Sequence, residues 1–183
     1  MLNRGNLRAV SAAVEAAGVR PGDAVADIGF GGGVGLPLLL DRVGDDGRVY
    51  GVEISTSMID RATRRFRRQV TAGRLRLLAG SLTAVPLPDD SLDGAITVNT
   101  VYFVPELDRA FAELARVLRP SGRLVVGIGD PDWMASLPVT PYGFTLRPVA
   151  EVVAGLERAG LTLAEHRQLR RGDQAFHLLS ARS

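Results

Sequence analysis

The chain has 183 residues, of which 46% are hydrophobic and 23% charged, and its formal net charge is +2. These values are typical of one globular domain and exclude a disordered or strongly basic chain. It contains no cysteine, and both histidines lie in its last twenty residues, so a disulfide framework and a zinc–thiolate site are excluded and we expect no metal. With no signal peptide and no membrane span recognisable, we expect a single cytoplasmic domain over 1–183.

Helical and strand patterns alternate along the first part of the chain. Residues 4–17 carry an apolar stripe at helical spacing, and the sequence GVRPGD ends that helix. A β-branched strand pattern follows at 24–28, a helical pattern at 34–43 and a second strand pattern at 47–54. This alternation is typical of a parallel sheet whose strands are connected by crossover helices.

The alternation continues to the end of the chain. The next elements are a helix, two strands, a helix and a strand, expected at 55–70, 75–78, 94–98, 107–118 and 123–128. Residues 129–147 show no periodic pattern. A helix is expected between Pro148 and Gly160, residues that favour its first turn and its end, and the remaining residues predict two strands of a hairpin around the sequence RRGD.

The stretch VADIGFGGGVGL, residues 25–36, follows the first strand and precedes a helix. Glycines at such a turn let the backbone approach a ligand closely, and the free N–H groups of the helix favour negative charge. Glu53 ends the next strand, 20 residues after Gly33, where a carboxylate can accept hydrogen bonds from both hydroxyls of a ribose. Together they predict an adenosine-containing ligand at the carboxyl edge of the sheet.

The glycine spacing narrows the choice of ligand. The dinucleotide pattern G-x-G-x-x-G fails, because Val34 or Leu36 occupies its last position. Asp27, just before the glycines, suits an ammonium or sulfonium group better than a pyrophosphate. A nicotinamide dehydrogenase is therefore disfavoured, and the absence of Gly-Lys-Ser/Thr excludes a P-loop.

Four segments, VADIGFGGG, VYGVEIS, AGSLTAVPLPDDSLDGAITVNTVYF and ARVLRPSGRLVVG, occur in this order over about residues 6–128. They resemble the class I S-adenosylmethionine-dependent methyltransferases, in particular the small-molecule branch that includes ubiquinone- and menaquinone-biosynthesis enzymes. The resemblance implies an α/β, Rossmann-like, doubly wound fold. Its mostly parallel seven-stranded sheet would have helices on both faces and a C-terminal antiparallel hairpin strand.

The resemblance also implies S-adenosyl-L-methionine as cofactor and a set of residues that bind it: Asp27, Gly29, Phe30, Gly31, Gly33, Glu53, Ile54, Met58, Ser81, Leu82 and Asn99. Asp27 would lie near the ammonium group of the methionine moiety, and Glu53 would hold the ribose. Asn99 would offer its backbone carbonyl to the amino group. One position departs from the family, because many relatives have Asp where Ser81 stands, and a neutral contact to the adenine is weaker.

An acceptor site is expected at residues 129–147, since long unpatterned segments are uncommon in compact domains and this one is rich in apolar residues. It leaves the fifth strand at the carboxyl edge, so we expect it to form the wall or lid of the acceptor site. The residues expected to contact an apolar or aromatic substrate are Tyr102, Trp133, Tyr142 and Phe144. An alternative place for the acceptor is around Asn3, Asn6 and Tyr102. No residue is identified as a catalytic base, although Asp130 and Asp132 also lie near the expected site.

Two functions from different classes remain open. The first is methyl transfer to a small molecule, and the second is a regulatory or non-catalytic protein that keeps the cofactor pocket. A nucleic-acid partner is not expected, because the arginines of the sequence DRATRRFRRQ lie opposite the apolar face of their helix, and no aromatic residues stand among them to stack on bases. The histidines are interpreted as ordinary strand or surface residues, and the chain is expected to be a monomer or homodimer.

Overall fold

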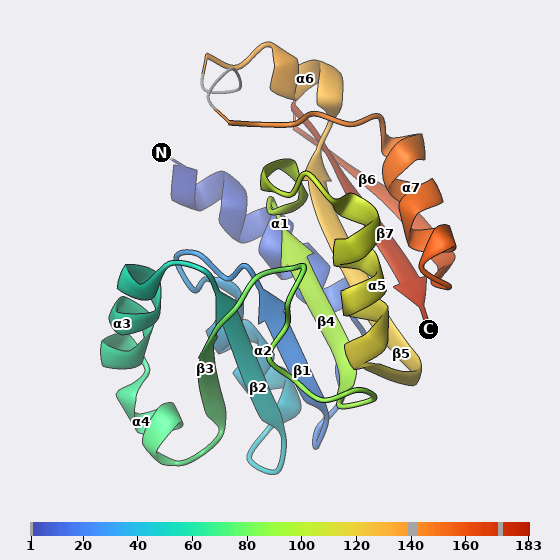
Figure 1. Cartoon of the computed structure of the whole chain (residues 1–183). Coiled ribbons are helices and arrows are strands. Elements are labelled where there is room, and N and C mark those ends of the chain that lie inside the picture. Colours follow the sequence, from blue (N-terminus) through green and yellow to red (C-terminus); the bar gives the residue numbers. More distant parts are fainter. Residues whose placement is uncertain (1, 139–142, 172–173) are drawn as a thin grey trace.

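The computed structural model describes residues 2–138, 143–171 and 174–183 (Figure 1). Its strands are β1 (Ala24–Ile28), β2 (Arg48–Glu53), β3 (Leu75–Ala79), β4 (Leu92–Val98), β5 (Leu118–Gly129), β6 (Thr162–Arg171) and β7 (Gln174–Arg182). Its helices are α1 (Leu2–Ala16), α2 (Gly35–Val43), α3 (Thr56–Arg65), α4 (Arg67–Thr71), α5 (Leu107–Val117), α6 (Pro131–Ala135) and α7 (Val149–Arg158), with a 3₁₀ turn, η1, at Val101–Phe103.

One mixed sheet joins the seven strands in the order β3-β2-β1-β4-β5-β7-β6. The pairs β1–β2, β1–β4, β2–β3 and β4–β5 are parallel. β7 is antiparallel to both β5 and β6, with which it forms the predicted C-terminal hairpin. The predicted α/β fold with a mostly parallel seven-stranded sheet is therefore confirmed.

The strand order reverses at β1, which has β2 on one side and β4 on the other. In open α/β sheets, ligands bind beyond the carboxyl ends of the strands at such a reversal. Asp27 lies near the carboxyl end of β1, and Asn99 directly follows β4. The topology therefore places these two residues, 72 positions apart in the sequence, at the same edge.

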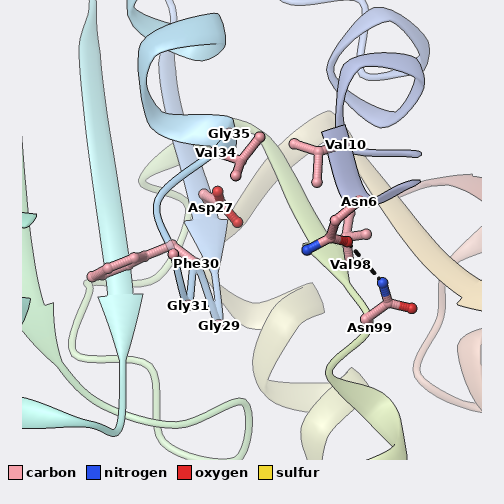
Figure 2. Close-up of a pocket in the computed structure, with 11 residues that line it drawn as sticks. Asn6, Val10, Asp27, Gly29, Phe30, Gly31, Val34, Gly35, Val98 and Asn99 are labelled. Atoms are coloured by element: carbon pink, nitrogen blue, oxygen red, sulfur yellow. Dashed lines mark hydrogen bonds between the residues drawn. The ribbon is translucent and has the colours of Figure 1, made fainter. Parts of the chain in front are cut away.

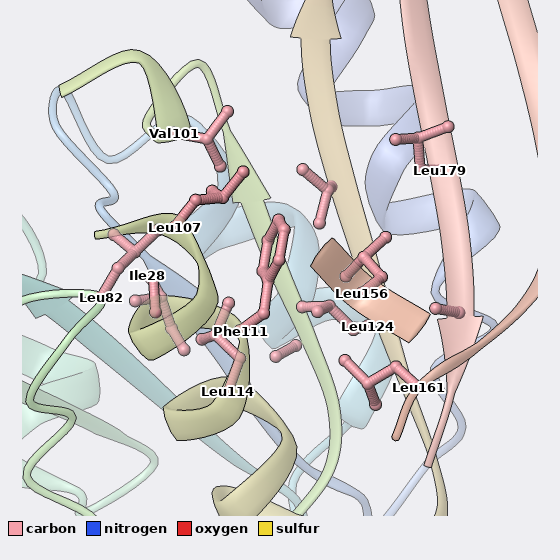
Figure 3. Packing of buried hydrophobic residues seen from close by; sticks show 14 of the residues in the cluster. Ile28, Leu82, Val101, Leu107, Phe111, Leu114, Leu124, Leu156, Leu161 and Leu179 are labelled. Carbon is pink, nitrogen blue, oxygen red and sulfur yellow. The ribbon is translucent and has the colours of Figure 1, made fainter. Parts of the chain in front are cut away.

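Helices cover both faces of the sheet, with α1 and α2 on one face and α5 and α7 on the other (Figure 1). The second face is packed around Phe111 of α5, which is fully buried (Figure 3). A Cβ atom on Gly155 of α7 would lie 3.0 Å from two atoms of the Phe111 ring, so glycine lets the two helices approach each other closely. Within the described ranges, no helix is long and apolar enough to cross a membrane.

The predicted helix at 55–70 is divided in two. α3 begins after Ser55, whose side chain accepts a hydrogen bond from the backbone N–H of Met58. At Phe66 the backbone leaves the helical conformation, with φ −107° and ψ 27°, and α4 follows it. The Phe66 side chain is nevertheless buried, which agrees with an apolar face on this part of the chain.

The prediction that residues 129–147 contain no regular element is wrong for the first residues of this segment. β5 extends to Gly129, and α6 follows at once. The Asp130 side chain caps this helix by accepting hydrogen bonds from the backbone N–H groups of Asp132 and Trp133, both at 3.1 Å, and Pro131 occupies its first turn. The sequence Asp-Pro is a helix-start signal, but a five-residue helix is too short to show periodicity.

Replacing Phe111 by alanine should lower the free energy of unfolding by about 3–5 kcal/mol, because a large buried ring is lost and a cavity is left behind. Chemical denaturation measures this change. The control is Phe103→Ala in η1, whose side chain is 56% exposed and whose loss should cost about 1 kcal/mol or less. Equal costs for the two variants would contradict the packing described for α5 and α7.

Candidate functional site

A cavity of about 180 Å³ opens at the carboxyl ends of β1 and β4, and we call it the β1 pocket (Figure 2). It is lined by residues of α1, β1, the glycine turn, α2 and the end of β4: Asn6, Val10, Asp27, Gly29, Phe30, Gly31, Gly32, Val34, Gly35, Val98 and Asn99. Five of the predicted cofactor-binding residues are thus brought together in one cavity, at the strand reversal where the fold favours a ligand.

The glycines of the turn are required by backbone conformation and by space. Gly29, Gly31 and Gly33 have φ values of 79°, 50° and 68°, in the left-handed region that side chains disfavour. Gly35 begins α2, and a Cβ atom there would lie 2.3 Å from Oδ2 of Asp27. The glycine at position 35 therefore keeps room for a carboxylate at the floor of the pocket.

Asp27 is a buried acid, only 5% exposed. No hydrogen bond or ion pair to its side chain is found among the described residues. Burial, and secondarily the negative charge of Glu53, raise its pKa from 3.8 to about 7. A buried carboxylate that lines a cavity without a partner favours the binding of a positively charged group.

Glu53 already holds the glycine turn in place. Its Oε2 accepts a hydrogen bond from the backbone N–H of Gly31 at 2.9 Å, and its Oε1 accepts from those of Ile54 and Ser55 at 2.9 and 3.0 Å. Glu53 does not line the β1 pocket itself, but it connects the pocket wall to the end of β2. Three of the roughly four lone-pair positions of a carboxylate are thus in use.

The remaining predicted cofactor residues lie at the same edge, outside the β1 pocket. Ile54 is 77% exposed, Met58 is half-buried, and Leu82 is buried. Ser81 follows Gly80, whose N–H donates to the backbone carbonyl of Glu53 at 3.1 Å. The Ser81 hydroxyl lies 3.1 Å from that of Thr83, so β2 and β3 bring these residues beside Glu53.

A polar network connects the end of β4 to α1 and β5. Asn99 has a left-handed backbone, φ 58°, and its Nδ2 donates to Oδ1 of Asn6 at 2.9 Å. The hydroxyl of Tyr102 donates to Oδ1 of Asn99 at 3.4 Å and accepts a short hydrogen bond from the backbone N–H of Gly129. Asn6 therefore belongs to the β1 pocket rather than to a separate site.

Two of the four residues predicted to contact the acceptor, Tyr102 and Phe144, form an aromatic cluster with Phe103. The ring of Phe144 lies 5.6 Å from that of Tyr102 and 4.7 Å from that of Phe103, measured between centroids. The backbone N–H of Thr145 donates to the carbonyl of Tyr102 at 2.9 Å, which holds this part of 129–147 against η1. Trp133 is half-buried in α6. Tyr142 lies outside the described residues.

Both histidines take part in a contact that the sequence did not reveal. Nε2 of His177 lies 3.0 Å from Oδ2 of Asp130, and its Nδ1 lies 2.8 Å from Nε2 of His166. The hydrogen bond with His177 is the main cause that lowers the pKa of Asp130, and burial lowers the pKa of His166. Asp130 therefore joins α6 to β7. In the described ranges, no three acidic or histidine side chains form a group that could hold a metal ion.

Replacing Asp27 by asparagine should stabilise the ligand-free protein in a pH-dependent way. Because folding raises the pKa of Asp27 from 3.8 to about 7, the wild type loses stability as pH rises between these values. The asparagine variant does not lose stability in this way. The difference between its free energy of unfolding and that of the wild type should therefore grow from pH 4 to pH 7 and then level off, at about 4 kcal/mol or less. Urea denaturation at several pH values measures it. An advantage that does not change with pH would show that Asp27 titrates normally.

Comparison with known proteins places the chain in a family. Residues 26–126 match the family model described as a methyltransferase domain. An arsenite methyltransferase of Halobacterium salinarum is 34% identical over 110 residues, which are 60% of this chain and 28% of that protein. A ubiquinone/menaquinone biosynthesis C-methyltransferase of Vibrio campbellii is 32% identical over 148 residues, 77% of this chain and 56% of that protein. The chain thus spans less than two thirds of these curated relatives.

Among solved structures, geranyl diphosphate C-methyltransferase of Streptomyces coelicolor has the same fold, with a TM-score of 0.82 at 18% identity over 94% of this chain and 77% of that one. The family match covers more than half of the chain. The resemblance found in the sequence is therefore confirmed, and the chain belongs to the methyltransferase domain family.

Proposed function

We propose that this chain binds S-adenosyl-L-methionine and transfers its methyl group to a small molecule. The observation that carries the proposal is the unpartnered carboxylate of Asp27 in a cavity lined by glycines. The methionine end of the cofactor bears an ammonium group that would partner this carboxylate. The solved relative from Streptomyces coelicolor holds S-adenosyl-L-homocysteine, the demethylated product of this cofactor, in the same fold.

The residues at the carboxyl edge fit the cofactor part by part, from its methionine end through the ribose to the adenine. The β1 pocket would take the methionine end against Asp27, Gly29, Phe30, Gly31 and Asn99, and Gly33 would shape the glycine turn beside them. Glu53 would accept the ribose hydroxyls, and Ile54, Met58, Ser81 and Leu82 would surround the adenine. Ile54 directly follows Glu53 and is 77% exposed, so its side chain is free to contact the adenine.

Glu53 would hold the ribose at a cost to its present contacts. Its Oε1 already accepts two backbone hydrogen bonds and its Oε2 one, so two ribose hydroxyls would have to share or displace a backbone donor. The glycine turn is shaped in advance by the same contacts. The ribose therefore contributes less to the free energy of binding than two new charge-assisted hydrogen bonds to an otherwise free carboxylate would contribute.

When bound, the cofactor supplies a sulfonium methyl group that is open to in-line displacement by a nucleophile. The chain's contribution is to hold acceptor and cofactor about 3 Å apart and aligned, which is worth about 7–11 kcal/mol in favourable cases. Two candidate bases are unsuited to proton removal. Burial raises the pKa of Tyr102 to about 12, and both carboxylate oxygens of Asp130 accept hydrogen bonds within the protein. We therefore assign no catalytic base.

We propose an apolar or aromatic acceptor, bound against the aromatic cluster and α6. Support comes from the half-buried rings of Phe144 and Trp133 and from the exposed ring of Phe103 at the carboxyl edge. One relative is named for ubiquinone and menaquinone biosynthesis, and one solved structure of the same fold is named for geranyl diphosphate, whose geranyl chain is apolar. Residues 129–147 would then form the wall of the acceptor site, which agrees with the hydrogen bond between Thr145 and Tyr102.

The direct test is to incubate the protein with methyl-labelled cofactor and a set of quinols, phenols and prenyl diphosphates, and to follow label in the products. Calorimetry should show binding of S-adenosyl-L-methionine and none of NAD. Glu53→Ala should weaken cofactor binding by about tenfold, since part of two charge-assisted hydrogen bonds is lost.

The control for Glu53→Ala is Glu106→Ala, at a carboxylate that precedes α5 and lies outside the β1 pocket. Tight NAD binding without S-adenosyl-L-methionine binding would overturn the proposal. Cofactor binding with no methylated product from any acceptor class would instead favour the non-catalytic alternative.

Phe144→Ala should raise KM for the acceptor or lower kcat severalfold while leaving cofactor affinity within about twofold, because a buried aromatic contact of the acceptor wall is worth roughly 1 kcal/mol or more. Steady-state kinetics and calorimetry measure the two effects. Leu7→Ala, at an exposed residue of α1, is the control. If Phe144→Ala instead abolishes cofactor binding in a folded protein, the segment belongs to the cofactor site.

A further inference from the structure

We propose that Asn6 of α1 selects ligands that carry a carboxylate at the β1 pocket, and that Tyr102 and Asn99 hold its amide in the orientation this selection requires. The proposal rests on the proposed function, because the carboxylate in question belongs to the methionine end of the cofactor. Asn6 is the specificity-determining residue, and Tyr102 is a positioning residue that acts through Asn99.

The first member of this network favours one direction for its hydrogen bonds. The backbone N–H of Gly129 can only donate, so the hydroxyl oxygen of Tyr102 accepts that bond. The hydroxyl proton is then free for Oδ1 of Asn99. With Oδ1 facing Tyr102, Asn99 presents Nδ2 to Asn6, and an N–H group there requires an acceptor. Oδ1 of Asn6, at 2.9 Å, is that acceptor.

The orientation of Asn6 follows from this order. Since its Oδ1 faces Asn99, its Nδ2 faces the opposite way, and Figure 2 shows this nitrogen directed across the pocket toward Asp27. Among the described residues, this Nδ2 has no hydrogen-bond partner. A reversed Asn6 amide would place two N–H groups against each other, so the network opposes that orientation.

The two walls of the pocket then have complementary chemistry. The carboxylate of Asp27 favours an ammonium group, and the N–H donors of Asn6 favour an anionic acceptor. Both side chains line the same cavity of about 180 Å³. A ligand end that carries an ammonium and a carboxylate on one carbon, as an α-amino acid does, satisfies both walls at once.

Calorimetric titration with S-adenosyl-L-methionine and with its decarboxylated form, which lacks only the carboxylate, separates this role from a general effect on the pocket. Asn6→Ala should weaken binding of the carboxylate-bearing ligand by about tenfold and leave the decarboxylated ligand within about twofold. Asn6→Asp keeps an acceptor for Asn99 but places a negative charge at the pocket. It should weaken the first ligand further and leave the second equal or tighter.

Tyr102→Phe tests the positioning step, because it keeps the ring against Phe144 and removes the hydroxyl that orients Asn99. We expect a selective loss of about threefold for the carboxylate-bearing ligand, since the amides of Asn99 and Asn6 are then free to turn over. Tyr50→Phe on β2, whose hydroxyl has no hydrogen bond among the described residues, is the matched control and should change neither affinity. Circular dichroism establishes that each variant is folded.

The outcomes separate this inference from the function on which it rests. If the wild type binds neither ligand, the proposed function is wrong. If the wild type binds S-adenosyl-L-methionine and Asn6→Ala alters the affinities of both ligands equally, or of neither, then the function stands and Asn6 is not the carboxylate-selective residue. If Asn6→Ala is selective and Tyr102→Phe is not, the positioning by Tyr102 is wrong.

Discussion

The arrangement at the carboxyl edge depends on the buried carboxylate of Asp27, which has no partner among the described residues. Removing Asp27 from water is unfavourable for its charged form, and the pKa of about 7 records this cost. Nearby features accommodate the group rather than neutralise it. Gly35 leaves space for its oxygen, and Gly29 and Gly31 bend the chain around it. A site with such a cost is stabilised by a ligand that brings a positive charge.

Backbone groups that are held in place before any ligand binds also contribute to the shape of the site. Glu53 accepts the N–H of Gly31 from the neighbouring strand, and Tyr102 accepts that of Gly129. Both side chains reach from one strand end to the next, so the turn after β1 and the start of α6 keep their shape through contacts across the sheet edge. A preformed pocket spends less of its binding free energy on ordering the chain.

The sequence predicted what depends on local pattern. The alternation of helices and strands predicted the parallel sheet, and the glycine turn with the acid at the end of the second strand predicted a ligand at its carboxyl edge. The resemblance to methyltransferases added the seven-stranded order and the five residues that line the pocket. The broken helix at Phe66 was missed, because its apolar stripe continues through the break. α6 was missed because five residues are too few for a helical period.

Contacts between distant residues were beyond prediction from one sequence. Asn6 and Asn99 are 93 positions apart, and His177 and Asp130 are 47 apart. Nothing in the local pattern of either pair indicates the other partner, and polar residues on a strand are more often solvated than paired. The packing of α1 against β4 brings Asn6 to Asn99, and the strand order, which places β5 beside β7, brings Asp130 to His177.

The position of the tryptophan gives this chain a built-in optical reporter. Trp133 is the single tryptophan of the chain, and it stands on α6, half-buried against the core and one turn from the Asp130 cap. The intrinsic emission of the protein under selective excitation therefore comes from α6 and not from the sheet. A molecule that binds against this helix, or a change that removes its cap, shifts the wavelength of that emission. The rest of the fold does not contribute to this signal.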